Sequence, residues 1–224
     1  MTSTEASAAE LESALADAVS GACYAGRVYV PENDPAALCL VLLSQHRLSF
    51  NPEPQETRDW LERAGIEAAV HVDETFNAVV TMRSANSVRQ VIDRVFAPYV
   101  RVEWAADGLR DVLASHGVDA TVRSYGPRGL GVYFSDTEGF ACAVRLAELL
   151  GVPDIAEGLK LGRPRGMRRL AERVRWVLAG VTGGAVGVQV FPGCVHEPDG
   201  VEVRLGTEQA AELGQRLVER AGDW

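Results

Sequence analysis

Residues 58–70 read RDWLERAGIEAAV, and residues 110–122, 52 positions later, read RDVLASHGVDATV. The two stretches align without a gap. The identical positions are Arg58/Arg110, Asp59/Asp111, Leu61/Leu113, Gly65/Gly117, Ala68/Ala120 and Val70/Val122, and Ile66/Val118 and Glu67/Asp119 are conservative matches. Self-similarity at a fixed spacing is the signature of an internal repeat, so these stretches predict two copies of one structural unit.

The matched residues fall where a helix would give way to a strand. Leu61 and Leu113 stand on the apolar face of a predicted helix, and Gly65 and Gly117 stand where that helix must end. After each glycine the spacing of apolar residues changes to two, as in a half-buried strand. Each copy therefore predicts a helix that ends at a glycine and is followed by a strand.

Turn residues, a second strand and an amphipathic helix follow in both copies. The second strands are predicted at 78–82 and 130–134. The apolar residues of the closing helices are spaced for one buried face: Val88, Val91, Ile92, Val95 and Phe96 in the first copy, and Phe140, Ala143, Ala147 and Leu150 in the second. The predicted unit is thus helix, hairpin, helix.

A diverged third copy is predicted from residue 167 onward, and a partial fourth at the N-terminus. Met167, Leu170, Val174, Val177 and Leu178 share one helix face, and two alternating strands and a helix follow. At the N-terminus a helix over about 5–19 precedes the apolar stretches GRVYV and LCLVLL. The expected fold is α+β, with tandem αββα repeats forming antiparallel sheet covered by helices.

The expected organisation has four parts. These are an N-terminal helix with strands (1–50), two αββα repeats (51–150), a linker rich in Gly, Pro and Arg (151–166), and the third repeat (167–224). The junction APYVRVEWAAD at 97–107 is predicted to contain a further strand, because Val100, Val102 and Trp104 alternate.

Composition indicates an ordinary globular chain. It has 224 residues, of which 47% are hydrophobic and 24% charged. The longest apolar run, AALCLVLL at 36–43, is too short to span a bilayer, and no secretory leader is recognised, so a cytoplasmic protein without membrane contact is expected. The net charge of −9 argues against general attraction to nucleic acid or anionic lipid.

Positive charge is concentrated between residues 160 and 175. Seven cations stand there against the single carboxylate of Glu172, which leaves −15 for the rest of the chain. The candidate nucleic-acid-binding residues are Lys160, Arg163, Arg165, Arg168, Arg169, Arg173 and Arg175. Two interpretations stay open: a DNA contact, or a solvated helix whose arginines pair with Glu172 and with acidic surface elsewhere.

The five residues from Gly162 to Gly166, Gly-Arg-Pro-Arg-Gly, resemble the core of the AT-hook, a short arm that lays Arg and Pro in the minor groove of A·T-rich DNA. Similar arms precede the DNA-binding domains of some site-specific recombinases. The resemblance implies an extended segment that follows a narrow groove. The chain departs from the motif at Leu161, where a basic residue would be expected.

No sequence pattern predicts catalysis, a cofactor or a metal. Cys194, His196, Glu197 and Asp199 are close together in one stretch, yet no second pair of ligands accompanies them, and the surrounding Pro and Gly are typical of a turn. The glycine-rich run at 180–187 lacks the Lys-Ser/Thr of a phosphate loop. Trp60, Trp104 and Trp176 are expected to be core or interface residues.

The sequence therefore favours a non-catalytic binding protein that presents a repeated α+β surface to a protein partner or to a second copy of itself. The alternative is a DNA-associated protein that uses the segment 160–175. A small-molecule enzyme of unknown type is the third possibility.

Overall fold

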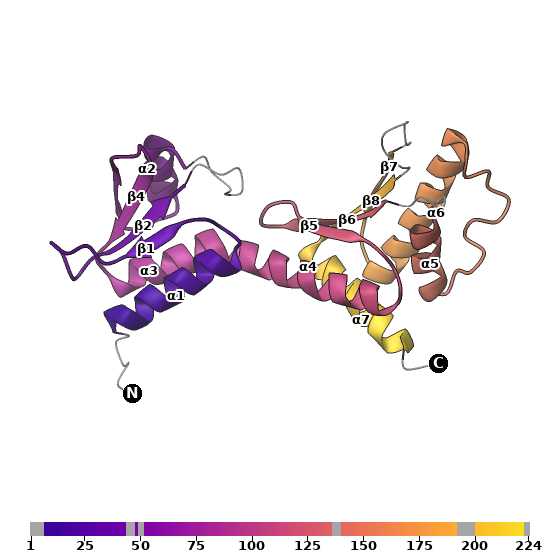
Figure 1. Cartoon of the computed structure of the whole chain (residues 1–224), viewed down its shortest axis with the longest axis horizontal. Helices are drawn as coiled ribbons and strands as arrows, with labels where there is room; N and C mark the ends of the chain where they lie inside the picture. Colours follow the sequence, from indigo (N-terminus) through magenta and orange to yellow (C-terminus); the bar gives the residue numbers. More distant parts are fainter. Residues whose placement is uncertain (1–6, 44–47, 49–51, 136–139, 192–199, 222–224) are drawn as a thin grey trace. The chain divides into compact units, whose positions relative to one another are not determined.

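The computed structural model describes residues 7–43, 48, 52–135, 140–191 and 200–221, which form two units. The units comprise residues 1–103 and 104–224 (Figure 1). Each contains one four-stranded antiparallel sheet with helices, so the α+β class predicted from the sequence is confirmed. None of the helices in these residues is both long and apolar enough to cross a bilayer.

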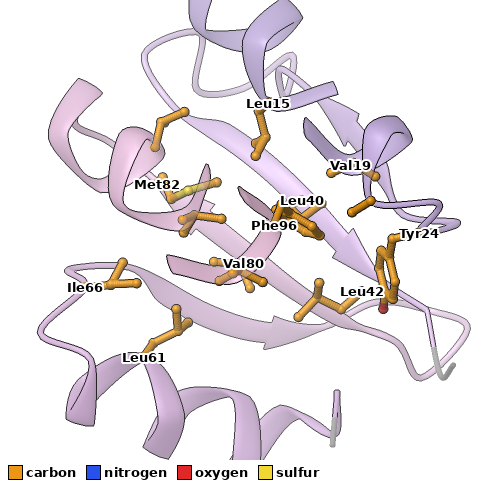
Figure 2. Close-up of a cluster of buried hydrophobic side chains, with 14 of the residues drawn as sticks. Leu15, Val19, Tyr24, Leu40, Leu42, Leu61, Ile66, Val80, Met82 and Phe96 are labelled. Carbon is orange, nitrogen blue, oxygen red and sulfur yellow. The ribbon is translucent and has the colours of Figure 1, made fainter. Parts of the chain in front are cut away.

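The first unit has the sheet order β1-β2-β4-β3. In chain order its elements are α1 (Ala8–Gly21), β1 (Arg27–Tyr29), β2 (Leu38–Leu42), α2 (Pro54–Arg63), β3 (Ala69–Val72), β4 (Ala78–Met82), α3 (Ala85–Val91), the π-helix η1 (Ile92–Phe96) and the first part of α4 (Ala97–Ser115). Residues of α1, α2, α3 and η1 share one buried core with Leu40, Leu42, Val80 and Met82 of the central strands (Figure 2). The helices therefore cover one face of this sheet.

The second unit has the corresponding sheet order, β5-β6-β8-β7. After the end of α4 come β5 (Thr121–Ser124), β6 (Gly129–Ser135), α5 (Ala141–Leu149), α6 (Pro164–Thr182), β7 (Gly187–Phe191), β8 (Gly200–Gly206) and α7 (Thr207–Ala221). The two hairpins predicted between residues 51 and 150 therefore lie in different sheets, β3–β4 in the first and β5–β6 in the second. Of the predicted linker 151–166, residues 151–163 lie between α5 and α6 of the second unit, and residues 164–166 form the start of α6.

The two matched stretches have the same local geometry. Gly65 and Gly117 both have left-handed backbones, with φ of 65° and 68°. The next residue donates its backbone N–H back to the matched leucine, from Ile66 to Leu61 (2.9 Å) and from Val118 to Leu113 (3.0 Å). A residue with positive φ ends a helix in this way, and glycine adopts that conformation without strain. Duplication itself stays a prediction.

The predicted strand at residues 97–107 is wrong, because these residues belong to the continuous helix α4. A run of three alternating residues is too short to define a strand against the longer helical pattern, in which Tyr99, Val102, Ala106, Leu109 and Leu113 are buried. Pro98 also suggests a break, since it has no N–H to donate to the carbonyl of Arg94. The π-helical turn η1 ends at Phe96, two residues before Pro98, and leads without a break into α4.

Replacing Leu113 with Ala should lower the free energy of unfolding by about 2–4 kcal/mol, because Leu113 is 1% exposed and the change leaves a cavity in the core. Urea denaturation measures the loss. Val218→Ala, at an exposed position on α7, is the matched control and should cost less than about 0.5 kcal/mol. Equal losses in the two variants would contradict the assignment of Leu113 to the core.

Candidate functional site

The sheet of the second unit has one face packed in the core and one open face. On β6 and β8 the core-facing residues are all buried: Leu130, Val132, Phe134, Val201, Val203 and Leu205. Because side chains alternate along a strand, the residues between them lie on the opposite face. The register there pairs Tyr133 with Glu202 and Gly131 with Arg204. We call this opposite surface the open face.

Tyr125 lies flat on the open face over Gly131. A Cβ atom at position 131 would lie 2.2 Å from Cε2 of the Tyr125 ring, so any side chain there would displace the ring. The guanidinium of Arg204 stands 5.5 Å from the centre of the same ring. Gly131 thus creates the space in which an aromatic ring and a cation stack.

Tyr133 takes the corresponding position over Gly200. A Cβ atom there would lie 2.4 Å from the Tyr133 hydroxyl oxygen. Phe191, which ends β7 beside Gly200 in the register, meets the Tyr133 ring edge-on, with ring centres 6.1 Å apart. Two glycines on adjacent strands therefore let two tyrosines and one phenylalanine form an aromatic surface.

Glu202 holds this arrangement in place. Glu202 is only 4% exposed, and both of its carboxylate oxygens have partners within the fold. The Tyr125 hydroxyl donates to Oε1, and Arg204 donates to Oε2 from Nε (3.1 Å) and approaches it with Nη2 (3.0 Å). A buried carboxylate needs such partners because its desolvation is otherwise unfavourable. Glu202 thereby fixes both side chains on the open face.

The hydrogen bond to Glu202 is the main reason that the pKa of Tyr125 is raised, with burial as a second cause. The phenol therefore keeps its proton and remains a donor at neutral pH. The open face offers aromatic rings, the exposed guanidiniums of Arg204 and Arg123, and the amide of Gln189. These groups suit binding, because each carboxylate oxygen already has a partner and is not free to act as a base.

The structure places the seven predicted cationic residues just before α6 and along its first twelve residues. Arg163 stands at the N-cap, Pro164 is the first helical residue, and all seven side chains are exposed. Among the residues that the structure describes, none of the seven forms an ion pair with a carboxylate. Arg173 instead donates to the backbone carbonyls of Ile155 (2.6 Å) and Glu157 (3.0 Å). The predicted pairing of this arginine face with carboxylates is absent from these residues.

The five residues that resemble an AT-hook do not form an extended arm. The backbone is extended at Arg163, but Pro164, Arg165 and Gly166 belong to α6. Gly166 is buried, and a Cβ atom there would lie 2.1 Å from the Lys160 carbonyl oxygen. Packing of the backbone against the first helical turn therefore accounts for this glycine.

Two of the predicted core or interface tryptophans are exposed. Trp104 is 71% exposed and Trp176 is 70% exposed, so neither tryptophan belongs to the hydrophobic core of this chain. Trp176 lies on the arginine-rich side of α6, where the Arg175 guanidinium is 5.4 Å from its ring centre. Trp60 is half-buried against the core of the first unit.

The stretch with Cys194, His196, Glu197 and Asp199 lies outside the described residues. Within the residues that are described, no group of three or more His, Cys, Asp or Glu side chains stands close enough to hold a metal ion.

Searches with the whole sequence and structure found no matching family model, no similar curated protein and no similar solved structure. Function is therefore inferred from the geometry of this chain.

Sequence patterns alone did not identify the open face as a site. Two residues after Gly131 and Gly200, on the same side of each strand, stand Tyr133 and Glu202. This spacing is only a weak local signal of a binding surface. The pairing of Tyr125 with Glu202 joins residues 77 positions apart. Such a contact depends on which strands become neighbours in the sheet.

Gly131→Ala should displace the Tyr125 ring and lower the pKa of its phenol toward the ordinary value, because the hydrogen bond to Glu202 is lost. Titration of 13C-labelled tyrosine by NMR measures this change. Tyr24, whose pKa burial raises to about 12, lies in the first unit and is the internal reference. Tyr125→Phe assigns the signal, and an unchanged Tyr125 titration in Gly131→Ala would show that the ring does not rest on this glycine.

Proposed function

We propose that this chain is a non-catalytic binding protein that holds a macromolecular partner on the open face of the second unit. The observation that carries the proposal is the aromatic surface of Tyr125, Tyr133 and Phe191, supported from below by two glycines and by buried Glu202. Tyrosine and arginine are enriched among residues that dominate binding energy at protein interfaces.

The fixed geometry of these side chains supports the same proposal. Binding costs conformational entropy when long side chains must be ordered, and side chains that are already held in place lose less. Arg204 is held by Glu202 and by the Tyr125 ring while most of its surface stays exposed. The open face is therefore preorganised for a partner, which is a protein or a second copy of this chain.

Tyr125→Ala combined with Tyr133→Ala should remove the partner from the purified chain. The test compares proteins cross-linked to the wild type and to the double variant in extracts of the native host, identified by mass spectrometry. The control is Phe76→Ala, which removes an 87% exposed aromatic ring from the first unit. A partner lost by the double variant and retained by the control is expected. Retention of every partner by both variants would refute the open face as the binding surface.

A DNA-associated function through residues 160–175 is the second candidate. The observation in its favour is that the seven exposed cations have no carboxylate partner among the described residues, so their charge is available to phosphates. Because Pro164–Gly166 are helical, this candidate predicts contact with the phosphate backbone of the duplex and not insertion of an extended arm into a groove.

In this second case, replacing Arg163, Arg165, Arg168 and Arg169 with Gln should abolish retention on duplex DNA at about 50 mM salt, where electrostatic binding is strong. The salt dependence of fluorescence anisotropy measures the number of phosphate contacts. Arg145→Gln with Arg216→Gln is the matched control. These arginines lie on α5 and α7 of the same unit, and each pairs with a glutamate on its own helix. Absence of binding by the wild type would eliminate this candidate.

A further inference from the structure

The solvent-facing side of α6 combines cations with one aromatic ring. The buried residues of this helix recur every three or four positions and form a single stripe: Met167, Leu170, Val174 and Leu178. At 3.6 residues per turn, Trp176 lies about 160° around the helix axis from both Val174 and Leu178. Trp176 therefore stands on the side of α6 opposite the buried stripe, where it is 70% exposed. We call this side the outer side of α6.

Arginines accompany Trp176 on the outer side of α6. Arg165, Arg169 and Trp176 follow one another at intervals of four and seven residues, so they form a row along one helix face. Arg168 and Arg175 flank this row, and the Arg175 guanidinium lies 5.4 Å from the centre of the Trp176 ring. The row is about 16 Å long, since each helical residue advances 1.5 Å. That length corresponds to about five nucleotides at the 3.4 Å spacing of phosphates along one strand.

The positive charge of the outer side is not neutralised by the residues that the structure describes. Glu172 is the one carboxylate of α6, and neither it nor any other described carboxylate forms an ion pair with these arginines. Arg168 and Arg173 donate to the backbone carbonyls of Pro164 and Ile155, and these bonds leave the charge of both side chains in place. An anionic ligand is therefore the electrostatic complement of this surface.

The aromatic ring indicates which anionic ligand fits. A planar base can stack on an exposed ring, as bases stack on aromatic residues in proteins that bind single strands. In a duplex the bases stack on one another and the phosphates form the outer surface, so Trp176 would gain no stacking partner there. A membrane surface would require several apolar side chains to enter it, and Trp176 is the only exposed large apolar residue along α6, all of whose residues are described.

We propose that the outer side of α6 binds a single-stranded nucleic acid, in which one unpaired base stacks on Trp176 and neighbouring phosphates contact Arg165 and Arg169. The proposal rests on the DNA-associated function given above as the second candidate, and it adds the class of nucleic acid and the residue that selects it. A duplex can meet the arginines only through its phosphates. DNA and RNA share the unpaired base and the phosphates, so strands of both kinds enter the test.

The probe is a fluorescein-labelled strand of about twenty deoxythymidylates, titrated with the full chain at about 50 mM salt and followed by fluorescence anisotropy. Binding is expected. An abasic strand of the same length keeps the phosphates but lacks the bases, and it should bind at least about fivefold more weakly, as should the duplex with deoxyadenylate. A uridylate strand of equal length compares RNA with DNA, and the tighter of the two identifies the source of the ligand.

Trp176→Ala should weaken binding of the thymidylate strand about fivefold or more, but binding of the abasic strand by less than about twofold, because ring and base contribute only as a pair. Trp176→Phe keeps an aromatic ring and should restore most of the affinity. The matched control is Trp104→Ala, which removes an equally exposed tryptophan from α4 and should change affinity by less than about twofold.

The arginines are tested by the salt dependence of binding. Arg165→Gln with Arg169→Gln should lower the slope of the logarithm of affinity against the logarithm of salt concentration by about 1.4, since each phosphate contact on a single strand contributes about 0.7. Circular dichroism and thermal unfolding should show an intact fold in every variant, because the replaced side chains are exposed. An unchanged slope would exclude these two arginines from contact with the phosphates.

Each contrary result overturns the proposal in a different way. If neither strand nor duplex binds at about 100 μM chain, the second candidate function fails together with the proposal. If the duplex and the abasic strand bind as tightly as thymidylate and Trp176→Ala changes nothing, the second candidate function survives and stacking on Trp176 is excluded. Loss of strand binding in Tyr125→Ala with Tyr133→Ala, but not in Trp176→Ala, would place the strand on the open face instead.

Discussion

The reversal of the backbone directly after a helix is the constraint on which both sheets depend. At Cys23, Gly65, Gly117 and Gly183 the chain adopts a positive φ, and a strand begins four residues later in each case. At Cys23, Gly65 and Gly117 the next residue donates its backbone N–H to a carbonyl in the last turn of the preceding helix, as Tyr24 does to Val19. The strand is thereby laid beneath the helix that precedes it, which explains why the helices gather on the face that contains Leu40, Val80 and Met82.

Once the helices occupy one face, the opposite face is available for a different use in each unit. In the first sheet Cys39, Val41 and Val79 are buried there by neighbouring side chains. In the second sheet glycine replaces such residues at positions 131 and 200, and tyrosines fold over the vacant space. The same sheet order therefore supports an apolar surface in one unit and an ordered aromatic and charged surface in the other. This difference favours the second unit as the binding part of the chain.

The distribution of charge separates two surfaces within the second unit. On the open face, Glu202 neutralises Arg204, while exposed Arg123 beside Gly131 has no carboxylate partner among the described residues, so that aromatic contact and one positive charge would both contribute to affinity there. On α6, positive charge is left without carboxylate partners in the described residues, beside an edge strand that carries no charge. Stacking on aromatic rings would dominate binding at the open face, and electrostatic attraction would dominate binding at α6.

The sequence by itself determined the local elements, because helix ends and strand alternation follow from near neighbours. Gly65 and Gly117 marked the helix ends, and the apolar spacing from Met167 to Leu178 marked the buried side of α6. It misplaced a strand at Val100–Trp104, where burial of Val102 and Leu109 in one helix outweighed a short alternation. Tertiary structure alone decided that the two matched hairpins enter different sheets, that Tyr125 reaches Glu202, and that Trp176 stands exposed on α6. Those outcomes depend on which strands become neighbours, a choice made by the burial of the whole apolar surface and not by any stretch of sequence taken separately.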